Sequence, residues 1–590
     1  MQWVLAEPDA GVAATLSDQA GLHPLVARLL VNRGITDAGD AQFFLACELS
    51  ALSEPRIFSH MDRAVRRIRT ALEAREQIVV YGDYDVDGVS GTALLYLALK
   101  RLGALVSAYI PDRMTEGYGL NSSALESIRK AGAGLVISVD CGITALREAG
   151  TARALGLDLI ITDHHEFERP AGVNGLNSPN LPDACAVLHP QHIVEDAPPG
   201  TRQHVAGLTG VGIAYKLVQA LSRQGADDEV LRSYLDLVTL GTVADIGRIT
   251  GENRILVKHG LEVLSSGAES GRPGIAALKQ VAGLSGKKIG VGTVGFSLAP
   301  RINASGRLER ADMAFRLLTT GSSEEARELA SALDAVNRER QSIEESIRAQ
   351  ARELCLQADL QTTGAFVLAS GEWHPGVIGI VASKIVDEFY RPAALVCVRN
   401  GVGKGSARSI PGFDLYESLT KCADLLLGFG GHKYAAGFTI AEENIPRFRE
   451  RLGSLVLEHV GARGFVRTLS VDGPITLEEL TLDLMRELEK LAPFGQGNPE
   501  PRLGARGLEV MSSGIVGKNH LKFRLRQGNG PVLGAIAFNK GMLLGKKVRD
   551  GARLAAVFTP RLNSWNGSTT VELEIRDVKV DKAECGKVGS

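Results

Sequence analysis

The sequence has no apolar run that approaches the ~18 residues needed to cross a bilayer as a helix, so no membrane-spanning segment is expected. Its seven cysteines are scattered and include no Cys-x-x-Cys pair, which argues against a disulfide framework and against structural zinc. The first residues show no basic stretch followed by an apolar core. We therefore expect no secretory signal and take the cytoplasm as the default compartment.

The composition is that of a globular protein, because 44% of the 590 residues are hydrophobic and 23% are charged. At roughly 150 residues per domain, this length predicts about three to five domains. The net charge of −2 identifies no polyanionic partner. Residues 501–579, however, hold 14 Lys and Arg against 5 Asp and Glu, a net charge of +9. Charge alone fits either a solvated basic surface or a track for a polyanion.

Short β-branched runs recur in the first half of the chain, and each is followed by polar loop residues and a helical pattern. They begin near positions 77, 104, 135 and 158. Such runs predict a parallel sheet that is buried on both faces. Ligands of these sheets gather at the carboxyl ends of the strands. The polar residues at these ends are Asp83, Asp85, Asp87, Asp140, Asp163, His164 and His165.

The remaining segments predict further domains. Residues 207–266 have the pattern of helices, interrupted by Asp236 and Asp245. Residues 323–357 contain no Pro or Gly, begin with Ser and Glu and are highly charged, which predicts a long helix that connects two domains. A second α/β domain is expected up to about residue 457. Beyond residue 465, alternating stretches separated by Gly and Asn predict a small antiparallel barrel.

Carboxylates spaced Asp-x-Asp-x-Asp, as at Asp83, Asp85 and Asp87, cannot all stay ionised in a dry site without compensation. A divalent cation provides it: carboxylates suit Mg²⁺ and Mn²⁺, and the imidazoles of His164 and His165 favour Mn²⁺ or another transition metal. Two ions ~3.5–4 Å apart would hold the attacking and leaving oxygens of a phosphoester, which indicates hydrolysis. Taken singly, the Asp stretch also fits a solvated turn, and the histidines fit a polar surface loop.

Two further stretches predict phosphate binding. Arg301, Asn303 and Arg307 lie close together in the sequence beside a glycine, and arginines with small neighbours can grip phosphate with two hydrogen bonds. Residues 403–409 and 429–438 add glycine-rich backbone with Ser406, Arg408 and His432. Each glycine-rich loop alone also fits a simple tight turn. Together they suit a polyphosphate chain that crosses two domains.

Nine ordered motifs resemble the bacterial RecJ exonuclease family, and the resemblance extends over nearly the whole chain. Asp-His-His alone would indicate only the wider DHH phosphoesterase superfamily. The motifs are DYDVDG (83–88), SVDCGIT (138–144), TDHH (162–165), GTVADIG (241–247), RINASGRL (301–308), EWHPGVIGIVASK (372–384), KGSARSIPGFDL (404–415), GGHKYAAGF (430–438) and LAPFGQGNPEP (491–501).

The resemblance implies an α/β fold: a parallel-sheet DHH phosphoesterase domain, a long connecting helix, a smaller α/β DHH-associated domain and a C-terminal OB-like β-barrel. On this basis the expected parts are an N-terminal cap segment at 1–50, the DHH catalytic domain at 51–320, the connecting helix at 321–360, the DHH-associated domain at 361–457, the OB-like nucleic-acid-binding domain at 458–580 and a tail at 581–590. The resemblance then implies that residues 501–579, with their net charge of +9, form a track for single-stranded nucleic acid.

The resemblance also implies the activity: a single-stranded-DNA-specific 5′-to-3′ exonuclease that releases 5′-mononucleotides with two Mn²⁺ or Mg²⁺ ions in DNA recombination, DNA repair and mismatch repair. Implied partners are single-stranded DNA, a single-stranded-DNA-binding protein and a RecQ-type helicase, with no membrane partner, and the protein is expected to be a monomer. The implied metal ligands and catalytic residues are Asp83, Asp85, Asp87, Asp140, His164, His165 and Asp245. The implied substrate-binding residues are Arg301, Asn303, Arg307, Ser406, Arg408 and His432.

The sequence departs from the family pattern at two places. Leu188, His189 and Pro190 stand where the family usually has Asn before Pro, and Gly247 and Arg248 follow Asp245 where a more apolar run is common. Neither departure removes a proposed ligand. Two alternatives stay open: another DHH phosphoesterase acting on oligoribonucleotides, cyclic dinucleotides or pyrophosphate, and a scaffold that keeps the fold without cleavage. The aromatic residues considered for base stacking, none of them selected, are Tyr118, Phe296, Trp373, Phe523, Phe538 and Trp565.

Overall fold

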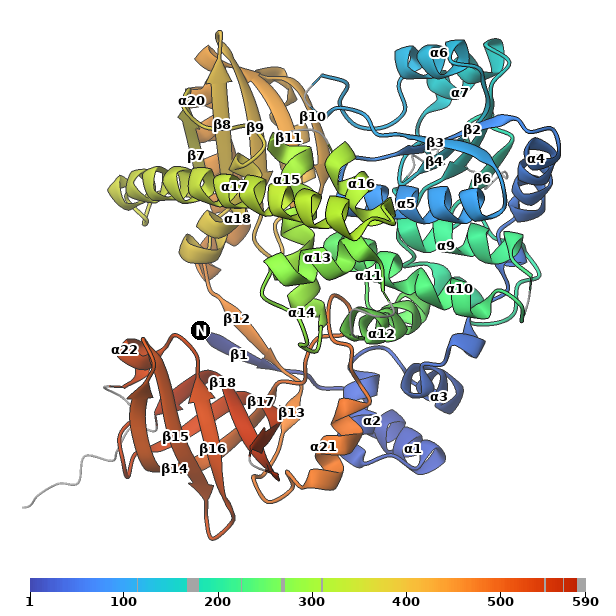
Figure 1. Ribbon diagram of the computed structural model, residues 1–590. Helices are drawn as coiled ribbons and strands as arrows, with labels where there is room; N and C mark the ends of the chain where they lie inside the picture. The colour runs from blue at the N-terminus through green and yellow to red at the C-terminus, as the bar shows by residue number, and fades with distance from the viewer. Residues whose placement is uncertain are drawn as a thin grey trace, which may run out of the picture.

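The computed structural model describes residues 1–590 except 114, 167–179, 224, 267–270, 309–310, 546–547, 566 and 581–590, and it does not describe the side chains of residues 463, 543 and 565. Figure 1 shows two α/β units above a β-barrel, with a long helix running across both units. In the described part of the chain, no helix combines the length and apolar character needed to span a membrane.

The first unit is built on a five-stranded sheet of order β3-β2-β4-β5-β6, in which every neighbouring pair is parallel. Alternate residues of β2 enter different cores, with Ile78 and Val80 on one face and Val79 and Tyr81 on the other. The sheet is therefore buried on both faces, as the sequence predicts. Its strands are β2 (Gln77–Gly82), β3 (Leu105–Tyr109), β4 (Ala133–Val139), β5 (Asp158–Thr162) and β6 (Ala186–Leu188).

Helices cover both faces of this sheet. The face of Val79 packs against α6 (Ser122–Lys130) and α7 (Leu146–Ala154). The opposite face carries the larger core, which includes the helices predicted between residues 207 and 266. The helices on that side are α4 (Met61–Glu73), α5 (Val86–Arg101), α8 (Thr201–Val205), α9 (Gly210–Leu221), α10 (Asp228–Ser233), α11 (Leu235–Ala244), α12 (Gly251–Ser265), α13 (Pro273–Val281), α14 (Val291–Thr293), the π-helical turn η3 (Val294–Leu298), α15 (Ala299–Leu308) and α16 (Asp312–Thr319).

The long helix α17 (Ser323–Gln357) joins the two α/β units. Its first turn is capped by the Ser322 hydroxyl, which accepts the backbone N–H of Glu325. Leu329 and Leu333 of its first half enter the core of the first unit, whereas Ile347 and Ala351 of its second half enter that of the second. One continuous helix therefore fixes the two cores relative to each other.

The second unit is a mixed five-stranded sheet of order β10-β11-β9-β8-β7, in which only β7 and β8 are parallel. It packs against α17 on one side. Its elements are β7 (Phe366–Ser370), α18 (Ile378–Phe389), β8 (Ala393–Arg399), β9 (Val402–Arg408), α19 (Leu415–Thr420), η4 (Ala423–Leu425), β10 (Leu426–His432), β11 (Ala435–Ala441), η5 (Glu442–Asn444), α20 (Ile445–Val460) and η6 (Gly461–Arg463).

The C-terminal unit is a β-barrel that closes through pairing of β14 with β17. The expectation of an antiparallel barrel was wrong in part, because β16 pairs with β18, and β13 with β14, in parallel. Alternation along a strand does not encode the direction of its neighbour. The elements are β12 (Thr468–Val471), β13 (Gly473–Pro474), α21 (Leu482–Glu489), β14 (Leu503–Val516), β15 (His520–Gln527), β16 (Val532–Ala537), α22 (Gly541–Leu544), β17 (Arg553–Trp565) and β18 (Ser568–Val580).

The N-terminal segment packs on this barrel, and its residues 43–47 also contact α8 and α12 of the first α/β unit. Strand β1 pairs in parallel with β12, and residues of the first three helices share a core with the barrel. We call this combination the N-terminal and barrel body. Its N-terminal elements are β1 (Gln2–Leu5), α1 (Ala10–Ala20), α2 (Pro24–Val31) and α3 (Ala38–Ala46), followed by the short helices η1 (Leu49–Ala51) and η2 (Pro55–Ile57).

Candidate metal centre and phosphate pocket

The register of the parallel sheet places three aspartates side by side. Gly82 pairs with Val139, and Val139 pairs with Thr162, so the next residue of each strand is an aspartate. The ladder continues through these residues: Asp83 N–H donates to Val139 O at 3.2 Å and Asp140 N–H donates to Thr162 O at 2.9 Å. The carboxyl edge of the sheet thus presents Asp83, Asp140 and Asp163 in one row.

Helix α5 adds two more carboxylates from its first turn. Asp85 is its N-cap and accepts the backbone N–H groups of Asp87 and Gly88 at 2.9 and 3.1 Å. The Asp87 carboxylate accepts the N–H groups of Gly210 and Val211 at the start of α9, at 2.7 and 3.0 Å. A Cβ at Gly210 would lie 2.5 Å from the Asp140 Cβ, so only glycine allows this approach. The start of α9 therefore holds Asp87 against Asp140.

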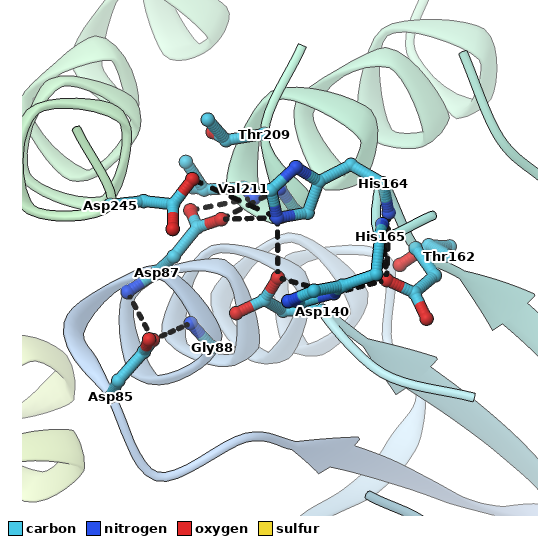
Figure 2. A network of polar contacts seen from close by, with 12 residues as sticks. Asp85, Asp87, Gly88, Asp140, Thr162, His164, His165, Thr209, Val211 and Asp245 are labelled. Atoms are coloured by element: carbon cyan, nitrogen blue, oxygen red, sulfur yellow. Dashed lines mark hydrogen bonds and ion pairs between the residues drawn. The ribbon is translucent and has the colours of Figure 1, made fainter. Parts of the chain in front are cut away.

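His164 lies at the centre of the cluster (Figure 2). Its Nε2 atom is 3.1 Å from Asp140 Oδ1, 3.8 Å from Asp245 Oδ2 and 3.9 Å from Asp87 Oδ2. Asp245 comes from the C-cap of α11, so the ring is surrounded by a strand end, α5 and α11. Four segments distant in sequence therefore meet at one imidazole.

Asp163 is turned away from this centre and orients the two histidines. Its Oδ1 accepts the backbone N–H groups of His164 and His165 and lies 2.8 Å from His165 Nδ1. Its Oδ2 accepts the N–H of Ile143 at 2.8 Å. The phenol of Tyr118 lies 3.0 Å from the same His165 Nδ1 and donates to Asp140 O at 3.1 Å. Partners of this kind fix the orientation of a metal-binding imidazole.

Burial and mutual repulsion hold the carboxyl groups of the cluster in a state that favours protonation. Burial, with the charge of Asp85 next, raises the pKa of Asp87 to about 7. Burial, with the charge of Asp87 next, raises the pKa of Asp245 to about 8. The pKa values of Asp83 and Asp140 lie well above their ordinary value for the same two reasons. The folded protein thus gathers carboxyl groups that are costly to ionise together, and a cation would offset that cost.

The two histidines differ in charge. Burial lowers the pKa of His164 to about 4, so its ring is neutral at pH 7 and can ligate a metal. Burial would also lower the pKa of His165, but the hydrogen bond to Asp163 and the charges of Asp163 and Asp245 outweigh burial and raise it to about 9.

Three groups of side chains bring ligand atoms within 4.8 Å of one another, and together they contain all seven predicted metal ligands. Asp140 and His164 each belong to two groups. Among the described residues, Asp83 Oδ1, Asp140 Oδ1 and His164 Nε2 are buried without a hydrogen-bond partner, which fits atoms that ligate a cation. The groups are Asp140, His164 and His165; Asp87, His164 and Asp245; and Asp83, Asp85 and Asp140.

A pocket of 510 Å³ lies between the two α/β units and carries cationic side chains. Ser406 and Arg408 reach it from β9, and Arg307 reaches it from α15, where its guanidinium donates to Gly376 O at 3.0 Å. Burial, with the charges of Arg113, Arg340 and Arg408, lowers the pKa of Arg307 to about 10. Buried cations that repel one another favour an anion between them.

The structure separates the other predicted phosphate contacts from this pocket. RINASGRL is helical, and residues six apart on a helix point in directions that differ by about 240°. Arg301 therefore faces α17, where its Nε donates to Asp334 at 2.8 Å. Asn303 also lies on α15, half-buried, but neither it nor His432, exposed at the end of β10, lines the pocket.

Sequence reasoning missed Arg113, which lines the pocket and lies over the ring of Tyr84, 5.2 Å from its centroid. Tyr84 stands between Asp83 and Asp85, so Arg113 links the pocket to the carboxylate cluster. The sequence could have indicated this residue, because Arg113 follows β3 and therefore lies at the same edge of the sheet as the aspartates.

The aromatic residues considered for stacking fall into two classes. Trp373 and Phe523 are fully buried core residues and cannot receive a base. Tyr118, Phe296 and Phe538 are exposed, and Phe296 has an exposed fraction of 88%. The side chain of Trp565 lies outside the described residues.

Comparisons with known proteins match each unit of the chain. Residues 77–242 match the DHH family N-terminal domain, residues 362–458 the DHHA1 domain and residues 471–577 the RecJ OB domain. The single-stranded-DNA-specific exonuclease RecJ of Bacillus subtilis strain 168 is 40% identical over 589 residues, which cover 99% of this chain and 71% of that protein.

Solved structures agree with these matches. A crystal structure of RecJ from Thermus thermophilus in complex with Mn²⁺ aligns with a TM-score of 0.78 and 30% identity, covering 99% of this chain and 80% of that one. The corresponding complex with Mg²⁺ aligns with a TM-score of 0.74 and 29% identity, covering 99% and 79%.

Proposed function

The chain belongs to the RecJ family, and from this premise we propose that it is a single-stranded-DNA-specific exonuclease that releases 5′-mononucleotides, in the 5′-to-3′ direction, with two divalent ions. The observation that carries the proposal is that three groups of ligand atoms share Asp140 and His164. The groups contain seven side chains, more than a single ion would use, so they support two ions. Relatives solved with Mn²⁺ and with Mg²⁺ support either ion as the cofactor.

The proposed ligands are Asp83, Asp85, Asp87, Asp140, His164, His165 and Asp245. Two bound ions would lower the pKa of a water between them and neutralise charge on the scissile phosphate. The protein's part is to orient this set. The start of α9 holds Asp87, and Asp163 holds His165. The carboxyl groups, whose raised pKa values favour protons in the metal-free state, would release those protons on binding the ions.

The polarity of cleavage would come from the phosphate pocket. We propose that Arg113, Arg307, Ser406 and Arg408 bind the 5′-terminal phosphate, since they form a cationic pocket that adjoins the carboxylate cluster through Tyr84. A strand anchored there by its end would place a phosphodiester near the cluster. A strand entering by its 3′ end would offer the pocket no terminal phosphate.

The barrel would hold the strand beyond the cut. In β15, Leu521, Phe523 and Leu525 are buried, while Lys522 and Arg524 between them are exposed. Because successive side chains of a strand point to opposite faces, Lys522 and Arg524 form a basic row on the outer face of the barrel. Single-strand tracks combine such rows with exposed aromatic residues. Exclusion of duplex DNA would follow from a path too narrow for two strands.

The proposed cellular role is DNA recombination and repair, including mismatch repair, in the cytoplasm. The proposed partners are single-stranded DNA, a single-stranded-DNA-binding protein and a RecQ-type helicase, with the enzyme acting as a monomer. These assignments rest on family membership.

The proposal is tested with 5′-labelled and 3′-labelled single strands, beside matching duplex and RNA, in Mn²⁺, Mg²⁺ or EDTA. We expect release of labelled mononucleotide from the 5′ label only, on single-stranded DNA only, and no release in EDTA. Early release from the 3′ label would contradict the polarity. Cleavage confined to very short oligomers would move the chain to the small-substrate phosphoesterases and leave the basic barrel face unexplained.

A further inference from the structure

The motif LAPFGQGNPEP (491–501) has no part in the metal centre or the phosphate pocket. It forms the loop between α21 and β14 of the barrel, which we call the coupling loop. Its tip is a tight turn in which Gly495 and Asn498 exchange backbone hydrogen bonds of 2.9 and 3.1 Å, with Gly497 at a φ of 76°. This turn projects from the barrel toward the first α/β unit.

The tip of the coupling loop contacts the chain just after Asp245. The backbone N–H of Ile249 donates to Gln496 O at 2.7 Å. Gly495 lies so close that an added Cβ would be 2.6 Å from Ile249 Cγ1. The contact therefore depends on the absence of a side chain at Gly495.

The same loop is fastened a second time by Arg254, in the first turn of α12. Its exposed fraction is 1%, and its guanidinium donates to the carbonyls of Lys490 and Leu491 at 2.8 and 2.9 Å and to Phe44 O at 3.1 Å. It also stacks on the Phe44 ring, 4.0 Å from the centroid. One buried cation thus joins the first α/β unit to the N-terminal and barrel body.

Within that body the loop is held rigidly. The Asn498 side chain is fully buried, and its Nδ2 donates to Leu491 O and Pro493 O at 2.8 and 2.9 Å. Its Oδ1 accepts from Nε of Arg33, in the turn after α2, at 2.7 Å. A shift of the body would therefore move the loop tip with it.

Asp245 needs such support more than the other ligands. Asp83, Asp140, His164 and His165 follow sheet strands, and Asp87 is bound by the start of α9, whereas Asp245 lies in the C-cap turn of α11. The next residue, Ile246, has a φ of 59° and an exposed fraction of 72%, so its side chain contributes little packing. The segment 246–250 is held by the end of α11, by Asn253 Nδ2, which donates to Arg248 O at 3.1 Å, and by Gln496 of the coupling loop.

We propose that the coupling loop is a positioning element for Asp245, which makes metal binding in the first α/β unit depend on docking of the N-terminal and barrel body. Gly495 and Arg254 are the positioning residues. The inference rests on the proposed function of the metal centre and assigns these residues no direct part in hydrolysis.

The test is Gly495→Ala in the full chain, with Gly150→Ala as the matched control, since Gly150 is an exposed position on α7 and a Cβ there meets nothing within 4 Å. Calorimetric titration of the DNA-free protein with Mn²⁺ should show about tenfold weaker binding in Gly495→Ala, the usual effect of losing a residue that orients a ligand. The control should bind as the parent does. Removing the opposing side chain in Gly495→Ala/Ile249→Ala should restore part of the loss.

Hydrolysis supplies the second readout. The Mn²⁺ concentration for half-maximal activity should rise about tenfold, while kcat at saturating Mn²⁺ and single-stranded DNA affinity in EDTA stay within about twofold of the parent. Unchanged Mn²⁺ binding, or a kcat loss that Mn²⁺ does not restore, would overturn the inference. If Gly495→Ala does not fold, Arg254→Lys carries the same expectations. A parent that neither binds Mn²⁺ nor cuts DNA would instead refute the proposed function.

Discussion

Both carboxylate oxygens of Asp87 accept backbone N–H groups from the start of α9, Oδ2 from Gly210 at 2.7 Å and Oδ1 from Val211 at 3.0 Å. A helix start also carries partial positive charge. Asp87 is thus oriented before any ion binds, and each oxygen keeps lone pairs for a cation. Asp245 differs from Asp87 in this respect, because its described side-chain contacts within the cluster are electrostatic interactions and not hydrogen bonds.

The two residues should therefore respond oppositely to neutralisation. Asp87→Asn places an amide N–H against a backbone N–H, so the metal-free protein should lose about 1–3 kcal/mol of unfolding free energy. Asp245→Asn relieves repulsion without breaking such a bond, so its melting temperature in EDTA at pH 8 should equal or exceed that of the parent. Thermal melts in EDTA measure both. A destabilised Asp245→Asn would contradict the repulsion argument.

Removal of a central ligand should abolish cleavage. Asp83→Ala or His164→Ala should reduce kcat by more than about 100-fold, because changes in residues that only orient a ligand already reduce metal affinity or activity by 10–100-fold. Single-stranded DNA affinity in EDTA should change little, since the phosphate pocket and the barrel are intact. Steady-state hydrolysis and fluorescence anisotropy distinguish the two effects. Near-normal turnover with normal metal content would remove the residue from the ligand set.

Metal-free stability should fall as pH rises from 6.5 to 9. The pKa values of Asp87, Asp245 and His165 are raised on folding to about 7, 8 and 9, so the folded state binds more protons, and the stability they contribute is lost as pH rises through these values. His164, whose pKa is lowered to about 4, acts in the opposite direction only below pH 6.5.

Melting temperatures in EDTA across this range provide the measurement. Saturating Mn²⁺ should flatten the profile because the ions replace the protons, and Mn²⁺ binding should release protons into the buffer. A metal-free profile that stays flat or rises from pH 6.5 to 9 would show that folding does not raise these pKa values.

The phosphate pocket should distinguish 5′ ends. Arg408→Ala removes a hydrogen bond to a charged group, worth about 1.5–3 kcal/mol, so kcat/KM on a 5′-phosphorylated strand should fall about tenfold or more. On a strand with a 5′-hydroxyl the same variant should lose much less, and that substrate is the control. Equal losses on both substrates would assign Arg408 a structural role.

The basic row on β15 should appear in the salt dependence of DNA binding. Each phosphate contact on single strands contributes a slope of about −0.7 to log affinity against log salt, so Lys522→Ala/Arg524→Ala should reduce the slope by up to about 1.4. Arg561→Ala is the control, because Arg561 pairs with Glu500 and Glu574 at 2.6 and 3.2 Å, whereas Lys522 lies 3.8 Å from Glu572. An unchanged slope in the double variant would place the strand on another face of the barrel.

Local patterns predicted much of the architecture. The β-branched runs predicted the parallel sheet, the uninterrupted charged stretch predicted α17, and the position of Asp83, Asp140 and His164 after strands predicted their meeting. These features depend on residue periodicity and on the common direction of parallel strands, which a sequence carries directly. The family motifs then added Asp245, which no periodicity indicates.

The sequence by itself determined which residue types are available and which strand or helix carries each one. Only the tertiary structure decided which faces meet. Arg307 and Arg113 line the phosphate pocket, whereas Arg301 pairs with Asp334. Residues 491–501 reach the turn that follows Asp245. The physical reason is that helix rotation and packing between distant segments are set by burial of the whole surface, which no local pattern encodes.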